Sequence, residues 1–313
     1  MDRQKMVLVG IIFIIAVTLS IASPKFLMVS NFTNVLLQVA IIIIIASAAN
    51  LLMITGNLDL SIGSILAFSG IMHAYLSKHG LPIWLSIIVT LILAGLWGSI
   101  NGFTVGKLKI VSIIATMGTM YAARGFAKLV ARWDGGANIS SGLPSNFIDF
   151  GRAMVFGKIP LVLVFMFLAI AVFIFIEKKT VLGRYTFAIG DNASASELSG
   201  IKVARVITIL YTLTGILAGF CGIVQVSRVG LAAPNIADTT HLDVIVAIVL
   251  GGTSMTGGEG STFGMILGAL IVGLASNGLN LLGVPFFYQQ IVQGLLLVTA
   301  VFIDQKMRLG KRG

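Results

Sequence analysis

The chain has 313 residues, of which 57% are hydrophobic and only 10% are charged, and its mean hydropathy is +1.04. A soluble globular domain carries about 25% charged residues, so this composition excludes a soluble enzyme, a disordered chain and a disulfide scaffold. The apolar residues come in blocks of about 20, which is long enough to cross about 30 Å of hydrocarbon as helices. The composition therefore predicts an all-α, polytopic membrane protein.

The apolar blocks predict about ten transmembrane helices in a single membrane domain that covers residues 1–313. A short basic stretch before the first block resembles the start of a signal peptide, but no small-residue cleavage pattern follows it and many further spans do. We therefore expect a first transmembrane helix and a cytoplasmic N-terminus. The predicted spans are residues 6–23, 34–55, 61–76, 83–105, 111–131, 160–176, 204–226, 239–254, 262–278 and 286–303.

The positions of the basic residues indicate the orientation of the chain. With ten spans and a cytoplasmic N-terminus, the C-terminus is cytoplasmic too, and most of the 21 Lys and Arg residues fall on the cytoplasmic side. The net charge of +10 is therefore explained by membrane topology, and we expect no nucleic-acid partner. The single cysteine, Cys221, lies in an apolar run and cannot form an intramolecular disulfide.

Two segments between the predicted spans are long enough to have their own structure. Residues 132–159 form an outer loop rich in Gly, Asn, Ser and Pro. Residues 177–202 form the longest cytoplasmic segment, in which Ala193 to Leu198 have a helical pattern with Asp191 or Asn192 as the N-cap.

Two glycine-rich breaks interrupt the hydrophobic pattern, at residues 55–63 and 251–261. Asp59 and Glu259 make each break acidic, and a carboxylate near membrane depth is costly enough to suggest a role. The breaks are either tight cytoplasmic turns, in which glycine supplies a positive φ, or contacts with a transported solute. In the first reading, Asp59 is the N-cap of the following span.

Signatures of enzyme chemistry are missing from the sequence. The histidines are scattered and no His-Glu-x-x-His motif occurs, so we expect neither a metal site nor catalytic residues. The run GTSMTG from Gly252 begins like a phosphate-binding loop, but Gly258 and Glu259 stand where Lys and Ser/Thr would follow. We therefore expect no cofactor in this chain, and any ATP-driven work must come from another polypeptide.

Small and polar residues inside the spans suggest a packed bundle with an uncharged polar interior. Gly95 with Ser99, Gly215 with Gly219, and Gly264 with Gly268 have the spacing that lets helix backbones approach closely. Neutral polar residues within the spans would suit the path of a sugar or form hydrogen bonds between helices. They include Gln38, Asn50, Asn101, Thr116, Gln225, Asn277, Asn280 and Gln293. Arg124 lies within a span, where it extends to the interface or faces an acidic partner.

Six runs of the sequence form a recognisable set: GNLDLSIGS from Gly56, LGRYTFAIGDN from Leu182, LSGIK from Leu198, DVIVAIVLGGTS from Asp243, GGEGS from Gly257 and NGLNLLG from Asn277. Together these runs are similar to the permease subunits of bacterial ribose-type ABC sugar importers. The resemblance covers nearly the whole chain except residues 132–159. Asn57 and Leu58 stand where the family usually has Gly-Ile, and Asp191 stands where it often has Gly, so substrate choice or dynamics could differ.

The resemblance implies a multi-pass protein of the bacterial inner membrane that performs no covalent chemistry. Its implied partners are a cytoplasmic ABC ATPase that binds ATP and Mg, a periplasmic or lipid-anchored sugar-binding protein, a second copy of the permease and membrane lipid. Segment 177–202 would then carry the helix that couples the permease to the ATPase. The residues expected to act in coupling are Gly183, Arg184, Gly190, Asn192, Ala193 and Gly200.

A second set of residues is expected to line the translocation path or its gate: Asn57, Asp59, Ser61, Asn101, Asn277 and Asn280. The sugar, a ribose-like pentose or a hexose, stays open. The alternative is a secondary transporter of a small polar solute driven by protons or sodium, for which the acidic breaks at Asp59 and Glu259 are the best argument. A membrane-embedded enzyme lacks a nucleophile–base pair or a metal constellation in this sequence.

Overall fold

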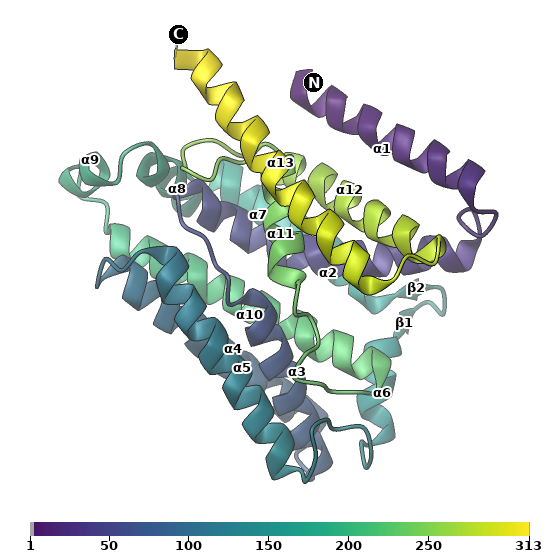
Figure 1. Cartoon of the computed structure of the whole chain (residues 1–313). Coiled ribbons are helices and arrows are strands. Elements are labelled where there is room, and N and C mark those ends of the chain that lie inside the picture. The colour runs from purple at the N-terminus through teal and green to yellow at the C-terminus, as the bar shows by residue number, and fades with distance from the viewer. Residues whose placement is uncertain (1–2, 313) are drawn as a thin grey trace. The chain divides into compact units, whose positions relative to one another are not determined.

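The computed structural model describes the backbone of residues 3–312 and the side chains of residues 5–285, 287–299, 301 and 302. It is helical apart from one short hairpin (Figure 1). The helices are α1 (Arg3–Ala22), α2 (Val29–Ile54), α3 (Ile62–Lys78), α4 (Ile83–Gly106), α5 (Ser112–Trp133), α6 (Ser145–Arg152), α7 (Leu161–Lys179), α8 (Val181–Asp191), α9 (Ala193–Leu198), α10 (Val203–Val229), α11 (Thr240–Leu250), α12 (Thr262–Leu281) and α13 (Phe286–Arg312), and the strands are β1 (Met154–Val155) and β2 (Ile159–Pro160).

Each of the ten predicted spans contains a helix, which confirms the all-α class and the polytopic character of the chain. In the part of the chain that the structure describes, six helices are long and apolar enough to cross a membrane: α1 from Lys5, α2, α4, α7, α10 and α12. The helix α3 has only 17 residues and α11 only 11. The number of ten membrane crossings and the side of the membrane on which each terminus lies therefore stay predictions.

The chain divides into two compact units, each assembled from separate stretches of sequence. Unit 1 contains residues 1–56, 169–192 and 242–313, and unit 2 contains residues 57–168 and 193–241. The boundary at residue 168 falls within α7, and the boundary at residue 192 falls between α8 and α9. Sequence neighbours at these boundaries thus belong to different packing units.

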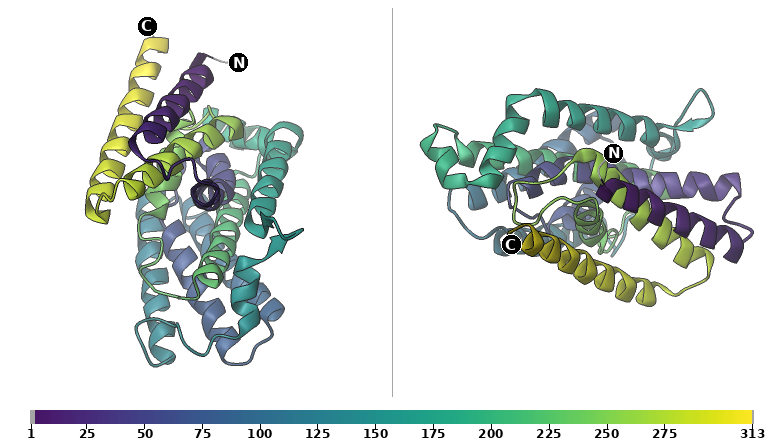
Figure 2. Two further views of the ribbon diagram at one scale, coloured as in Figure 1. Left: turned by 90° about the vertical axis from the view of Figure 1, so that its right-hand side faces the viewer. Right: turned by 90° about the horizontal axis from the view of Figure 1, so that it is seen from above.

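In unit 1, α12 packs between α1 and α2, and Figure 2 shows α1 beside α12. Leu8 of α1 is buried against Leu267 and Ile271 of α12. The glycines predicted to allow close packing do so, because a Cβ on Gly264 or Gly268 would overlap carbonyl oxygens of Gly251 and Ala247. This confirms the small-residue pattern read from residues 264 and 268.

In unit 2, the long helix α10 packs along α4 and α3. A Cβ on Gly215 would lie 2.6 Å from the carbonyl oxygen of Ala94, and one on Gly222 would overlap that of Leu66. Since only glycine fits at such separations, these positions set the distance between the helix backbones. The prediction for Gly215 is confirmed.

Residues 132–159 are not an unstructured loop, because they contain α6 and the β1–β2 hairpin. Phe147 of α6 is fully buried in unit 2 and stacks on His73 of α3 with 4.9 Å between ring centroids. Ile139 forms an isolated antiparallel bridge with Ala232. The Gly, Asn and Pro content of this segment correctly indicated turns but concealed the buried anchor at Phe147.

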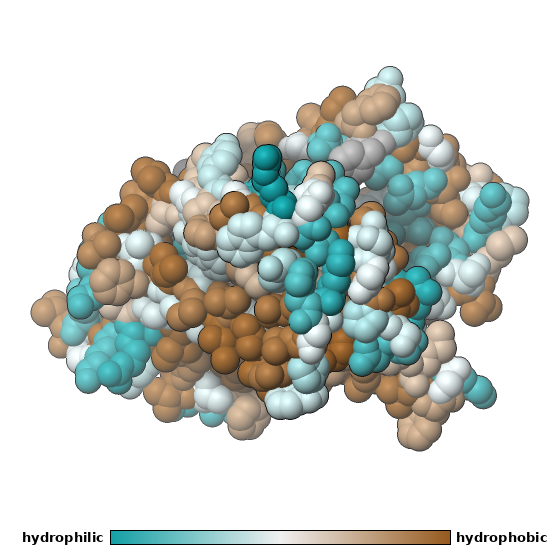
Figure 3. Space-filling model, turned by 90° about the horizontal axis from the view of Figure 1, so that it is seen from below, coloured by the Kyte–Doolittle hydropathy of each residue, from teal (hydrophilic) through white to brown (hydrophobic). Residues whose placement is uncertain are grey.

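The outer face of α4 is apolar along its length. Ile88, Ile92, Leu96 and Ile100 are all exposed and recur every four residues, so they lie on one side of the helix. Figure 3 shows hydrophobic side chains spread widely over one face of the molecule. Exposed apolar patches of this extent mark a membrane or protein interface, which is expected for a membrane protein.

Candidate functional site

Segment 177–202, predicted to couple the chain to an ATPase, forms two short helices. The helix α8 begins after Thr180, whose Oγ1 accepts a hydrogen bond of 3.2 Å from the backbone N–H of Gly183, as an N-cap does. The helix α9 occupies Ala193–Leu198, the stretch for which the sequence predicts a short helix. The additional helix α8 was not expected.

The helix α9 is almost entirely exposed, with Ser196 its only buried residue. Leu198 at its C-terminal end is 91% exposed, although it is a large apolar side chain. Gly200 has a φ of +85° and its N–H donates to the carbonyl oxygen of Glu197, so it ends the helix in the left-handed conformation that glycine favours. The result is a small helix that presents an apolar tip.

The position of α9 in unit 2 is supported by an ion pair. Lys109 Nζ lies 3.2 Å from Glu197 Oε1, with both side chains more than half exposed. Lys109 lies between α4 and α5 and has a φ of +58°. The ion pair links the α4–α5 connection to α9. Since both side chains are exposed, it contributes little stability.

Gly183 and Gly190, two of the residues expected to act in coupling, are packed against backbone within unit 1. A Cβ on Gly183 would overlap the carbonyl oxygens of Ile176 and Glu177 at the end of α7. A Cβ on Gly190 would overlap the carbonyl oxygen of Ile54 and the backbone of Gly258. These glycines therefore join α8 to its neighbours at backbone distance.

The other residues expected to act in coupling lie on the surface. Arg184, Asn192 and Ala193 are exposed. Asn192 ends α8, where its backbone N–H donates to the carbonyl oxygen of Ala188. Of the six residues expected to act in coupling, the structure thus packs Gly183 and Gly190 and leaves the other four exposed. The role of all six in coupling stays a prediction.

The second glycine-rich break, residues 251–261, is a tight turn packed against the end of α2. Gly252, Gly257 and Gly258 have positive φ, and Ser254 N–H donates a hydrogen bond of 2.9 Å to Glu259 O. Gly258 N–H donates to Ile54 O at 2.9 Å. Side chains reinforce this contact, because Thr253 Oγ1 donates to Asn50 Oδ1 at 2.6 Å. The local structure is therefore a tight turn, the first of the two alternatives predicted for this break. A contact with a transported solute stays a prediction.

The start of α12 is held by a carboxylate from the end of α7. Glu177 Oε2 accepts hydrogen bonds from the backbone N–H of Thr262 at 2.7 Å and from its Oγ1 at 2.5 Å. A carboxylate at a helix N-terminus also interacts favourably with the helix dipole. Glu177 therefore connects the beginning of segment 177–202 to the helix that follows the second break.

The first break is closed by a buried polar cluster in unit 2, which we call the Asp59 cluster: Asp59, Ser61, Asn101 and Thr119. Thr119 Oγ1 donates to Asn101 Oδ1 at 2.5 Å, and Asn101 Nδ2 donates to Ser61 Oγ at 2.9 Å. Asp59 Oδ1 in turn accepts from both Ser61 Oγ, at 2.5 Å, and Ser61 N–H, at 2.8 Å. The side-chain hydrogen bonds thus run in one direction, from Thr119 through Asn101 and Ser61 to the carboxylate of Asp59.

The Asp59 cluster corrects the expectation that Asp59 is the N-cap of α3. The N-cap residue is Ser61, and its side chain makes no capping hydrogen bond. Asp59 lies two residues before Ser61 and accepts a hydrogen bond from its hydroxyl, while Asn101 donates to the same hydroxyl oxygen. The nearby backbone is also satisfied, since Tyr211 Oη donates to Leu58 O at 2.8 Å.

The remaining residues expected on the path lie apart from the Asp59 cluster. In unit 1, Asn277 of α12 and Asn31 of α2 form a reciprocal amide pair, with Nδ2–Oδ1 distances of 2.8 and 3.2 Å. Asn280 Oδ1 accepts from Gln289 Nε2 at 2.9 Å. Asn57 is half-buried at the start of the first break in unit 2. Three of the six residues are thus joined in one cluster, and the role of all six on a path is untested.

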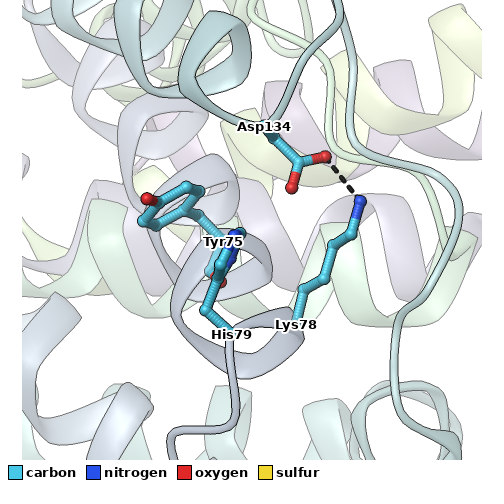
Figure 4. A network of polar contacts seen from close by, with 4 residues as sticks. All are labelled: Tyr75, Lys78, His79 and Asp134. Atoms are coloured by element: carbon cyan, nitrogen blue, oxygen red, sulfur yellow. Dashed lines mark hydrogen bonds and ion pairs between the residues drawn. The ribbon is translucent and has the colours of Figure 1, made fainter.

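The opposite end of unit 2 has a charged network of its own. Lys78 Nζ lies 2.8 Å from Asp134 Oδ2, and Tyr75 and His79 lie against each other with 4.2 Å between ring centroids (Figure 4). Arg124 forms an ion pair of 2.9 Å with Asp238. Of the two alternatives predicted for Arg124, extension to the interface or an acidic partner, the structure thus shows the acidic partner.

The sequence did not single out several residues on which these networks depend. Asn31 lies before the predicted start of its span and Glu177 directly after the predicted end of another. Thr253 lies in the second glycine-rich break, and Thr119 and Tyr211 are ordinary residues within predicted spans. A polar residue at the end of a span, as at Glu177 and Asn31, is the one signal that could have identified part of this set. The partners of the others are distant in sequence.

Together, the long apolar helices and the junctions packed through glycine define a multi-pass helical membrane protein. The chain belongs to the family described as "Branched-chain amino acid transport system / permease component", whose model matches residues 31–301. As a member of this family, it is a multi-pass protein of the bacterial inner membrane.

Three relatives are similar over almost their whole length. The chain is 40% identical to the ribose import permease protein RbsC of Bacillus subtilis, over 94% of this chain and 91% of that protein. It is 36% identical to RbsC of Haemophilus influenzae, over 95% and 91%. It is 33% identical to the fructose import permease protein FrcC of Rhizobium meliloti, over 92% and 81%. No solved structure matches the chain.

Proposed function

We propose that this chain is the permease subunit of an ABC importer that carries a monosaccharide, a ribose-like pentose or a hexose, into the cytoplasm. Its relatives include import permeases for ribose and for fructose, which are a pentose and a hexose. An uncharged polar path suits such substrates because it offers hydrogen-bond donors and acceptors to hydroxyl groups without an unpaired charge. The common function of these relatives supports import as the direction.

The proposal includes the partners that such a subunit requires. A separate cytoplasmic ATPase binds ATP and Mg, as the likeness to import permeases implies. An extracytoplasmic sugar-binding protein delivers the substrate, and a second copy of the permease completes the membrane part. Membrane lipid surrounds the helices, and no nucleic acid takes part.

We propose ten crossings, cytoplasmic termini and one membrane domain made of both units. In that topology α2 runs inward and ends at Ile54, which places the end of α2, the second break and the end of α8 on the cytoplasmic side. The hydrogen bond from Gly258 to Ile54 and the packing of Gly190 against both residues support this placement. Three segments that the proposed topology places on the cytoplasmic side are thus in contact with one another.

The proposed mechanism starts at α9, whose exposed Leu198 enters a groove on the ATPase. ATP binding and hydrolysis move the coupling segment, and α8 transmits the movement because Gly190 contacts Ile54 and Gly258 without an intervening side chain. The permease then switches between outward-open and inward-open states, as a packed bundle with two arrangements does. Arg184, Asn192 and Ala193 would contact the ATPase directly, since they are exposed.

The residues assigned to the path or gate act in this proposal by exchanging partners. The Asp59 cluster is buried, so its hydrogen bonds hold the first break closed. When the helices move apart, the amide of Asn101 and the hydroxyl of Ser61 become available to sugar hydroxyls. Asn57, Asn277 and Asn280 would contribute neutral polar groups at other points of the path.

The observation that carries the proposal is the junction of Gly190 with Ile54 and Gly258, which connects the coupling segment to the end of α2 and to the second glycine-rich break in unit 1. The test replaces Ala193 by Trp or Gly200 by Val and measures capture of the ATPase by the purified permease. We expect weak capture and little uptake for both variants. Normal capture together with normal uptake would remove the coupling role of this segment.

A further inference from the structure

A groove of about 570 Å³ opens between α4 and α10 in unit 2. One end of the groove is marked by Lys107, directly after the last residue of α4, and by Arg205, in the first turn of α10. Both cations therefore lie at the same end of the helix pair. The groove is lined by Phe103, Lys107, Ala204, Arg205, Thr208, Ile209, Thr212 and Leu213.

Beyond these two cations the groove offers no unsatisfied polar group. Thr208 Oγ1 donates to Ala204 O at 2.8 Å, and Thr212 Oγ1 donates to Thr208 O at 2.7 Å. Thr212 Oγ1 also lies 2.9 Å from Ser99 Oγ of α4, so both hydroxyls are hydrogen-bonded within the protein. Phe103 and Ile209 are exposed and contribute apolar surface. The interior of the groove therefore suits a hydrocarbon chain.

The two cations at the mouth are available to a ligand. Neither Lys107 nor Arg205 forms an ion pair with any residue whose side chain the structure describes. Lys107 Nζ lies 5.4 Å above the ring of Phe103, so its ammonium group is held over the groove. Lys109 nearby is different, because it is paired with Glu197.

The length of the groove matches one leaflet of a bilayer. From Ala204 to Leu213 the helix rises by about 13 Å at 1.5 Å per residue, and half of the hydrocarbon core is about 15 Å thick. On α4, the exposed apolar side chains Ile100, Leu96 and Ile92 precede Phe103 along the helix. An acyl chain could therefore run from the cations at the mouth along apolar surface only.

We propose that this groove binds an anionic phospholipid of the cytoplasmic leaflet, whose headgroup phosphate pairs with Lys107 and Arg205 while an acyl chain lies along the surface furrow where α4 and α10 meet. The leaflet rests on the orientation given under the proposed function. Basic pockets between transmembrane helices on the cytoplasmic side are suited to anionic headgroups, because the charge attraction adds to the apolar contact.

A second copy of the chain fits this groove less well than a lipid. In a two-fold dimer whose axis passes through this groove, the same patch of both subunits comes together, and Lys107 and Arg205 of one copy face their counterparts. Like charges at an interface are unfavourable, whereas a phosphate neutralises them. Charge complementarity thus selects the lipid.

The test uses the full chain purified in a mild detergent, with native mass spectrometry as the measure of retained phosphatidylglycerol. The variant carries both Lys107→Gln and Arg205→Gln. The matched control carries Lys128→Gln and Lys158→Gln, which remove the same charge from exposed positions elsewhere in unit 2. Thr208→Trp fills the groove without changing charge. The melting temperature with added phosphatidylglycerol, phosphatidylcholine or inorganic phosphate is a second measurement.

We expect the wild type and the control to retain phosphatidylglycerol, and the Lys107/Arg205 variant to bind it about 25-fold more weakly, since each basic residue contributes about fivefold. Thr208→Trp should also lower retention. Equal retention by the Lys107/Arg205 variant, equal stabilisation by phosphatidylcholine or by inorganic phosphate, or loss of dimers without loss of lipid in Thr208→Trp would overturn the proposal. None of these readouts depends on sugar uptake, so a failure here is distinct from a failure of the proposed function.

Discussion

The backbone N–H of Gly258 donates a hydrogen bond of 2.9 Å to the carbonyl oxygen of Ile54. The same carbonyl oxygen is the atom that a Cβ on Gly190 would overlap. Three segments far apart in sequence thus meet at one backbone position of unit 1. Because no side chain separates them, a displacement of α8 must displace the second break or the end of α2.

Adding a methyl group at Gly190 should disrupt this junction. Glycine to alanine within a helix is normally stabilising by roughly 0.5–1 kcal/mol, but here the Cβ meets backbone atoms that cannot move aside. We expect Gly190→Ala to lower the melting temperature and reduce ATP-dependent uptake at least tenfold. The control is Gly125→Ala in α5, where a Cβ would have nothing within 4 Å and uptake should be unchanged. Equal behaviour of the two variants would contradict the role of the junction.

The Asp59 cluster should show coupling between Asn101 and Thr119. Each single replacement, Asn101→Leu or Thr119→Val, leaves a buried partner unsatisfied and should destabilise the protein by about 1–3 kcal/mol. The double variant should cost less than the sum of the two, because the hydrogen bond between them is then lost only once. The measurement is a double-mutant cycle of thermal stability, and simple additivity would show that the two side chains do not interact.

The reciprocal pair of Asn31 and Asn277 offers an independent test of helix packing in unit 1. Asn31→Leu alone or Asn277→Leu alone should destabilise the contact between α2 and α12, since the remaining amide is buried without its partner. The double Leu variant should recover much of the loss, because both polar groups are removed together. If uptake also recovers, the amides act in packing, whereas a folded double variant without uptake would support their place on the path.

The exposed tip of α9 should affect binding of the ATPase without affecting folding. Leu198 is 91% exposed, so Leu198→Ala should leave the melting temperature unchanged. A buried apolar anchor at an interface is worth about 2 kcal/mol or more, so the affinity for the ATPase should fall about 30-fold. Phe156, at 92% exposure in the β1–β2 hairpin, is the matched control, and Phe156→Ala should bind the ATPase normally. An unchanged affinity for Leu198→Ala would place the contact elsewhere.

The helices were largely predictable because hydrophobic blocks and membrane thickness determine them without reference to tertiary contacts. The short helix at Ala193–Leu198 and the packing glycines at Gly215 and Gly268 were predictable for a similar local reason. The helix α6 was missed because a single buried residue, Phe147, anchors an otherwise polar segment.

The polar networks could not be derived from the sequence in the same way. The partners Asn31 and Asn277 are 246 positions apart, and Asn50 and Thr253 are 203 apart. Composition marks such residues as candidates but does not pair them. Asp59 illustrates the limit, since its type and position suggest an N-cap while the hydroxyl and amide groups around it select another geometry.

The central claim is that this chain is a conduit driven by a separate ATPase, and uptake by proteoliposomes tests it most directly. Vesicles containing the permease, its ATPase, the sugar-binding protein and ATP should accumulate labelled ribose or another monosaccharide against its gradient. Vesicles containing the permease alone should not, even with an imposed proton or sodium gradient. Accumulation by the permease alone, driven by such an ion gradient, would contradict the account.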